Sequence, residues 1–134
     1  MRKLGVLIEA LSTRFLWLPF FFALPFVVLC PSKALKLVLF GLAVPVSVAL
    51  HEFLHVVLLP PNGFILRKGT FLTIEVVGNA SRETLFLSSI LPGIVLGTVG
   101  LILLPGYGLV AIPFLLHFLT IPADIAGLGG IKLG

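Results

Sequence analysis

Long apolar runs are the feature that most constrains the fold of this chain. Of its 134 residues, 59% are hydrophobic and only 10% are charged, whereas a soluble domain carries about 25% charged residues. So few charges cannot cover a surface that faces water, but they suit a chain whose solvent is a lipid bilayer. We therefore expect an all-α membrane protein that forms a single multi-pass domain over residues 1–134.

Four stretches are apolar enough to form membrane-spanning helices. The Pro-rich segment 60–63 ends the second stretch, and the turn at 105–108 separates the third from the fourth. In the third, Gly93, Gly97 and Gly100 form a face of small residues that lets a neighbouring helix approach closely. The predicted spans are residues 10–30, 35–59, 84–104 and 109–124.

The N-terminus also has some features of a cleaved signal peptide, because a basic start precedes an apolar stretch. Glu9 and Arg14 interrupt that stretch, and no small-residue cleavage site follows it. We therefore treat the segment as a membrane helix. The single cysteine, Cys30, excludes an intrachain disulfide.

Residues 64–77 differ from the apolar runs and predict a short β-hairpin at the membrane surface. Arg67, Lys68 and Gly69 are expected to form its turn, and the stretch 70–76 is rich in β-branched residues with partial alternation. The segment after the hairpin offers Asn79 or Ser81 as the N-cap of the next helix.

The basic residues predict how the spans are oriented. With the N-terminus in the cytoplasm, seven lysines and arginines lie on the cytoplasmic side of the four-span layout and only Lys33 and Lys36 on the other, which follows the positive-inside rule. The chain has no basic cluster with interleaved aromatic residues, so a nucleic-acid partner is not expected. The expected surroundings are membrane lipid.

The second span carries the motif His51-Glu52-Phe53-Leu54-His55. Residues four apart lie on one helix face, so the two imidazoles can bind one Zn²⁺, and Glu52 beside them can take a proton from a metal-bound water. Between Leu37 and Leu66, Glu52 is the only formally charged residue. An ionisable group at membrane depth costs a few kcal/mol, about 3 on insertion scales, and usually faces a partner or a water-filled cavity.

A catalytic zinc also needs a third protein ligand. Asp124 is the only aspartate in the chain, and the predicted layout places it at the same membrane depth as His51 and His55. His117 is the competing candidate, about two helical turns deeper, although a histidine hydrogen-bonded between helices is the favoured interpretation of this residue. We expect the metal ligands to be His51, His55 and Asp124, with Glu52 as the catalytic residue.

This motif, followed by a hairpin and by two more spans with an aspartate near the last, resembles the site-2 protease family of intramembrane zinc metalloproteases. In size the chain is similar to small zincin-like membrane proteins related to that family. The resemblance covers about residues 35–128. The segment Ile121-Pro122-Ala123-Asp124-Ile125 lacks the asparagine and glycine of the usual Asn-Pro-Asp-Gly form.

The resemblance implies that His51, His55 and Asp124 bind zinc and that Glu52 is the general base. It also implies that the hairpin holds a transmembrane or membrane-proximal peptide substrate as an added strand. Two alternatives stay open at this point. One is a metal-binding membrane protein without protease activity, either a zinc carrier or an inactive scaffold. The other is a haem protein in which His117 pairs with His51 or His55.

Overall fold

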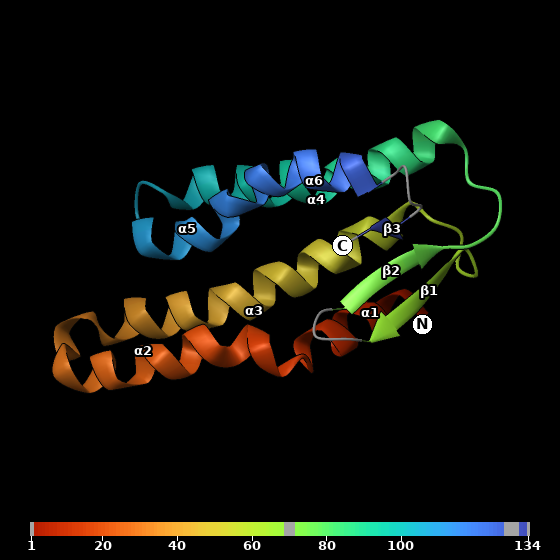
Figure 1. The fold of residues 1–134 in the computed structure, drawn as a ribbon. Coiled ribbons are helices and arrows are strands. Elements are labelled where there is room, and N and C mark those ends of the chain that lie inside the picture. Colours follow the sequence, from red (N-terminus) through yellow and green to blue (C-terminus); the bar gives the residue numbers. More distant parts are fainter. Residues whose placement is uncertain (1, 69–71, 128–131, 134) are drawn as a thin grey trace.

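A computed structural model describes residues 2–68, 72–127 and 132–133 of the chain, and in it the helices form two layers with a small sheet at one end (Figure 1). The first layer holds α1 (Arg2–Leu11), the 3₁₀ turn η1 (Arg14–Trp17), α2 (Leu18–Leu29), η2 (Pro31–Lys33) and α3 (Ala34–Val57). The second layer holds α4 (Arg82–Leu103), α5 (Gly108–Leu115), η3 (Leu116–Leu119) and α6 (Thr120–Gly127).

The lengths and composition of the helices agree with the predicted spans in all but the first. Three helical segments are long and apolar enough to cross a membrane, namely Pro31–Val57, Arg82–Leu103 and Gly108–Gly127. The predicted first span, 10–30, is not one straight helix, because the segments Lys3–Leu11 and Arg14–Leu29 meet at a bend of 59°. Counting that bent pair as one span gives four.

Two hydroxyl side chains account for the bend. Ser12 Oγ donates to the carbonyl of Glu9 at 2.7 Å, and Thr13 Oγ1 approaches the same carbonyl at 3.3 Å. Serine and threonine hydroxyls that bond to nearby backbone groups compete with the helical ladder. The helix therefore ends at Leu11, and a separate helical segment begins at Arg14.

The sheet consists of β1 (Phe64–Lys68), β2 (Leu72–Val76) and β3 (Lys132–Leu133), in the order β1-β2-β3 with antiparallel pairing. The hairpin predicted over 64–77 is thus present, but Arg67 and Lys68 lie in β1 and not in the turn. The Arg67 guanidinium forms an ion pair with Glu75 on β2, which favours a strand position. Gly69 lies outside the described residues. The strand β3 was not predicted.

The glycine face of α4 packs closely against the last helical segment, Gly108–Gly127, which consists of α5, η3 and α6. A Cβ atom on Gly93 would lie 2.9 Å from the carbonyl oxygen of His117, and one on Gly100 would lie 2.7 Å from the amide nitrogen of Leu115. Both neighbours are backbone atoms, so side-chain movement cannot relieve either contact. The close helix approach predicted from these glycines is therefore confirmed. The N-cap of α4 is Ser81, whose Oγ accepts from the Thr84 amide at 3.1 Å.

Two apolar cores hold the layers together. The larger core joins α1, the end of α3 and the hairpin, and its fully buried members include Val6, Val56 and Ile74. The smaller core joins α3, α4 and α5 through Ala43, Leu96 and Phe114. Large apolar side chains also cover the outer surface of the helices, among them Phe22, Val28, Leu29, Ile102 and Leu119, each more than 70% exposed.

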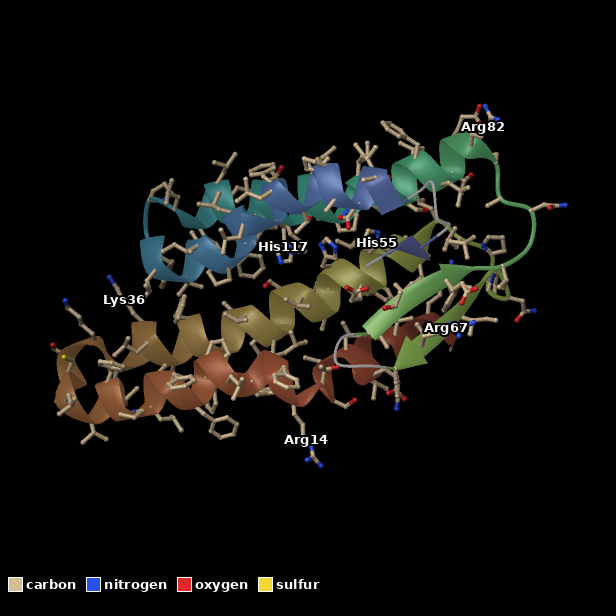
Figure 2. All side chains as sticks on the ribbon, in the orientation of Figure 1. Arg14, Lys36, His55, Arg67, Arg82 and His117 are labelled. Carbon is tan, nitrogen blue, oxygen red and sulfur yellow. The ribbon has the colours of Figure 1, made fainter. Side chains whose placement is uncertain are left out.

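The labelled basic residues separate along the long axis of the molecule (Figure 2). Lys36 lies at the end where α2 turns into α3, and Arg67 and Arg82 lie at the sheet end. Arg14, which was predicted to lie on the same side as Arg67 and Arg82, is instead between the two ends, because the bend after α1 places η1 along the body of the protein.

Candidate metal site

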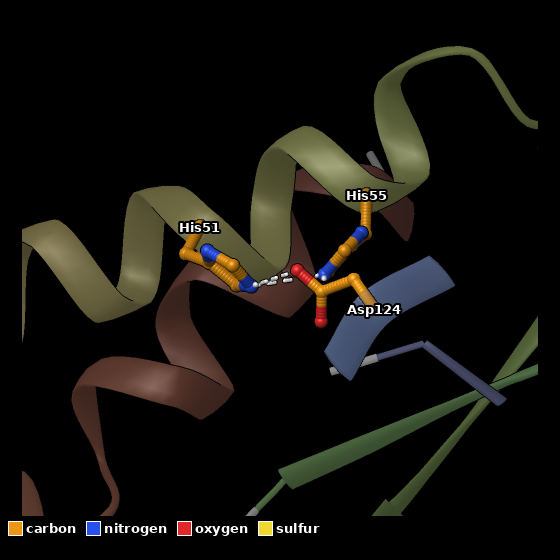
Figure 3. Close-up of side chains that lie close together, drawn as sticks. All are labelled: His51, His55 and Asp124. Carbon is orange, nitrogen blue, oxygen red and sulfur yellow. Dashed lines mark hydrogen bonds and ion pairs between the residues drawn. The ribbon is translucent and has the colours of Figure 1, made fainter. Parts of the chain in front are cut away.

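The second half of α3 projects His51 and His55 from one helix face (Figure 3). Both side chains are buried, with 5% and 0% of their surface exposed. Their Nε2 atoms are 3.0 Å apart, and the two rings meet edge to face at 87°. The spacing of four residues thus brings one nitrogen of each ring to a common point, as the motif predicts.

Asp124 reaches this point from α6 in the opposite layer. Its Oδ2 lies 3.4 Å from His51 Nε2, and its Oδ1 lies 3.7 Å from His55 Nε2. The carboxylate is buried, and the candidate ligand atoms of the three residues all lie within 4.8 Å of one another. The structure therefore brings together the three side chains that the sequence proposed as ligands.

The distances suit a bound cation. Two ligand atoms held at about 2.0–2.1 Å by a tetrahedral ion are about 3.4 Å apart, close to the separations of His51 Nε2 from the other two groups. Two buried carboxylate oxygens, Glu52 Oε2 and Asp124 Oδ2, have no hydrogen-bond partner among the described residues. A cation held at the cluster would give Asp124 Oδ2 a partner. The cluster can thus hold a metal ion, and two imidazoles with one carboxylate suit Zn²⁺ or Fe²⁺.

The other nitrogen of each ligand ring is also occupied. His55 Nδ1 donates to the carbonyl oxygen of Ser88 on α4 at 2.8 Å. His51 Nδ1 lies 3.0 Å from Nδ1 of His117, and these two rings stack with centroids 4.8 Å apart. Such bonds fix the tautomer and the orientation of ligand histidines. Sequence reasoning did not identify Ser88, because a backbone carbonyl carries no side-chain signal.

His117, the competing third ligand, therefore lies behind His51 and not beside Asp124. Its Nδ1 contacts the nitrogen of His51 that points away from the cluster. The two Nδ1 atoms, only 3.0 Å apart, also leave no room between the rings for an iron atom and the plane of a haem. The pairing of His117 with His51 across a haem iron does not fit this arrangement.

Glu52 follows His51 on α3 and lines a cavity of about 30 Å³ together with Ala10, Thr13, Leu16, Val48 and Leu72. That volume is enough for one or two water molecules. Thr13 and Leu72 also line a larger cavity of about 300 Å³ at the bend after α1, next to the ion pair of Lys68 with Glu9. Glu52 thus lines space that water can fill.

Comparison of the chain with protein-family models, with curated proteins and with solved structures gives no match. The site must therefore be interpreted from its own residues.

Proposed function

We propose that this chain is an integral membrane endopeptidase that uses Zn²⁺ to hydrolyse peptide bonds at or within the bilayer. The observation that carries the proposal is the convergence of His51, His55 and Asp124 from two helical layers. Glu52, which follows His51 on α3, is buried, and its Oε2 has no hydrogen-bond partner among the described residues. Two histidines and a carboxylate are the ligand set of several zinc peptidases. The motif that supplies them resembles that of the site-2 proteases.

The surroundings support a location at membrane depth. Helices α3 and α4 and the segment from α5 to α6 are long and apolar enough to cross a bilayer, and their outer surfaces are apolar. At about 1.5 Å per residue, His51 lies about 26 Å along α3 from its first residue. The proposed site would then lie near the surface at the sheet end, which the basic residues predict to be cytoplasmic.

The chemistry divides between the cation and the chain. When bound, Zn²⁺ polarises the scissile carbonyl and makes a water molecule nucleophilic near neutral pH. His51, His55 and Asp124 hold the cation. Glu52 accepts the proton of the attacking water and later donates it to the leaving amide nitrogen. Glu52 also lines a cavity that is large enough to hold water.

A helical substrate must unwind before cleavage, because its backbone groups are already hydrogen-bonded. The sheet offers alternative partners by strand addition. Since β2 pairs with β1 on one side and with β3 on the other, a substrate strand would either add to the outer edge of β1 or replace β3.

The test is the replacement Glu52→Gln in the full chain, reconstituted in phospholipid vesicles with a set of labelled single-span peptides. Removing a general base typically costs about 10²–10⁴-fold in rate. We expect the wild-type chain to generate new peptide termini, detected by mass spectrometry, and the variant to lose this activity while it retains zinc. The matched control is Glu83→Gln, which alters an exposed carboxylate in the first turn of α4.

Cleavage that survives in the zinc-loaded Glu52→Gln variant would contradict the mechanism. A non-proteolytic zinc carrier or scaffold, the alternative function, needs the three ligands but not Glu52. For such a protein, neither the wild type nor the variant would cleave any peptide, and both would bind zinc equally.

A further inference from the structure

The contact between His51 and His117 has a property that follows from its chemistry. Two ring nitrogens 3.0 Å apart share one proton, so one nitrogen donates and the other accepts. The same holds for the two Nε2 atoms of His51 and His55, which are also 3.0 Å apart. His51 therefore takes part in two such contacts, one through each of its nitrogens.

His55 fixes which nitrogen donates in its contact with His51. Its Nδ1 faces the carbonyl oxygen of Ser88, which can only accept, so that nitrogen must carry the proton. In a neutral imidazole the other nitrogen, Nε2, is then an acceptor. Without a cation, His51 completes the short contact by donating from its own Nε2 to Nε2 of His55. His51 Nδ1 is then bare and accepts from Nδ1 of His117.

A bound cation reverses the direction of donation between His51 and His117, because it binds the bare lone pair of a ring nitrogen. Once His51 Nε2 faces a cation it carries no proton, so the proton of a neutral His51 must sit on Nδ1. His51 then donates to His117 Nδ1, and His117 must carry its own proton on Nε2.

We propose that His117 is a positioning residue whose tautomer changes with cation binding: it donates to His51 in the empty site and accepts from His51 in the loaded site. The inference rests on the proposed cation site but not on proteolysis. The protons balance: in the empty site one lies on His51 Nε2 and one on His117 Nδ1. In the loaded site one lies on His51 Nδ1 and one on His117 Nε2, and none is released from the pair.

The role of His117 follows from this exchange. By accepting from His51 Nδ1, it holds the ring with Nε2 turned to Asp124 and makes that nitrogen a better ligand. Ser88 does the same for His55. Each ligand histidine is thus oriented by one group from the layer that carries Asp124.

The direct test is nitrogen NMR of the full chain in detergent micelles, with ¹⁵N-labelled histidine, before and after addition of Zn²⁺ alone. We expect His117 to change from the Nδ1–H to the Nε2–H form and His51 to change in the opposite sense. A His117 tautomer that is the same in both samples overturns the proposal. A zinc-induced shift of a His117 nitrogen typical of direct coordination also overturns it.

A set of variants separates positioning from packing. His117→Leu removes the acceptor, and by analogy with outer groups of other metal sites it should weaken zinc binding about 10–100-fold in competition with a chelator. His117→Asn places an amide oxygen near the position of Nδ1 and should restore most of the affinity. Equal weakening by both variants, or none by His117→Leu, contradicts the assignment.

The matched control for local disturbance is Thr120→Val. Thr120 Oγ1 donates to the backbone carbonyl of His117 at 2.8 Å, so this change perturbs the same turn without touching the imidazole bond. We expect unchanged zinc affinity. Because all these measurements use zinc binding and NMR, they stand even if Glu52→Gln shows that the chain is not a peptidase.

Discussion

The two halves of α3 are equally helical but are built from different residues. In the half before residue 47, the buried positions are small and apolar, namely Gly41, Ala43 and Pro45. From residue 47 onward, the buried positions include a hydroxyl, two imidazoles and a carboxylate, those of Ser47, His51, His55 and Glu52. Along one continuous helix, the buried positions thus change from residues that only pack to residues that can bind a metal ion or exchange a proton.

The neighbours of the two halves explain the change. The first half packs against α2, where a Cβ atom on Gly41 would lie 2.9 Å from the Cα of Phe20. Much of the surface of α2 is exposed and apolar. The second half is enclosed by α1, the hairpin and α6. Polar groups at depth are tolerated where protein or water surrounds them. The difference indicates that α1 and the hairpin shield the polar half of α3 from its surroundings.

The largest effect is expected from Asp124→Ala, which removes the ligand that the opposite layer gives to the polar half of α3. Zinc binding should fall by more than the roughly 10–100-fold typical of an outer group, and purified protein should contain far less than one zinc per chain. Metal analysis after purification in detergent checks this. Near-stoichiometric zinc in the variant would mean that Asp124 of the opposite layer is not a ligand. The polar half of α3 would then not differ from the apolar half in the way proposed here.

A smaller effect on zinc binding is expected from substitutions at the glycines of α4, because Gly93 lies beside His117 and Gly100 does not. Gly93→Ala and Gly100→Ala each place a Cβ against backbone of the last helical segment, and such overpacking costs about 1–3 kcal/mol. Both should lower the melting temperature, but only Gly93→Ala, which acts at His117, should also weaken zinc binding. Gly106→Ala is the control, because nothing lies within 4 Å of its added Cβ. Equal zinc affinities for all three variants would show that the site tolerates displacement of the layer.

The smallest effect is expected at the surface ion pair between Glu9 on α1 and Lys68 on β1. Lys68 is 69% exposed, so Glu9→Gln should change the free energy of unfolding by less than about 1 kcal/mol. Val6→Ala on the same helix removes fully buried apolar atoms and should cost about 1–3 kcal/mol. Thermal unfolding in one detergent compares the two. A larger loss of stability from Glu9→Gln than from Val6→Ala would show that the ion pair, and not the apolar core, holds α1 and the hairpin against α3.

The helices and the ligand set could be predicted from the sequence because each has a local signal. Runs of apolar residues identify spans, and a spacing of four on a helix places His51 beside His55. Asp124 followed from its being the only aspartate in a layout that put it at the same depth. For His117 the sequence left two roles, a competing third ligand or, as the favoured interpretation, a histidine hydrogen-bonded between helices. The second role agrees with the structure, in which His117 Nδ1 lies against the far nitrogen of His51, but the sequence carried no signal for that particular partner.

Two errors came from the sheet. Arg67 and Lys68 were expected in the turn because charged residues beside a glycine often form one, but cross-strand pairing with Glu75 accommodates Arg67 in β1. The strand β3 has only two residues and follows a glycine-rich segment, so neither periodicity nor propensity marks it. Only the second error concerns a pairing partner that is distant in the chain, because β3 pairs with β2 whereas Arg67 and Glu75 belong to the same hairpin.

The separation of the ligands along the chain has a consequence for biosynthesis. Both imidazoles are translated with α3, whereas the carboxylate that completes their set arrives only with α6. For the membrane protein proposed here, a nascent chain that inserts one helix after another would hold an incomplete set until α6 has docked on the glycines of α4. Capture of the proposed ion would thus wait for the end of assembly, when the surrounding helices already confine what the site can reach.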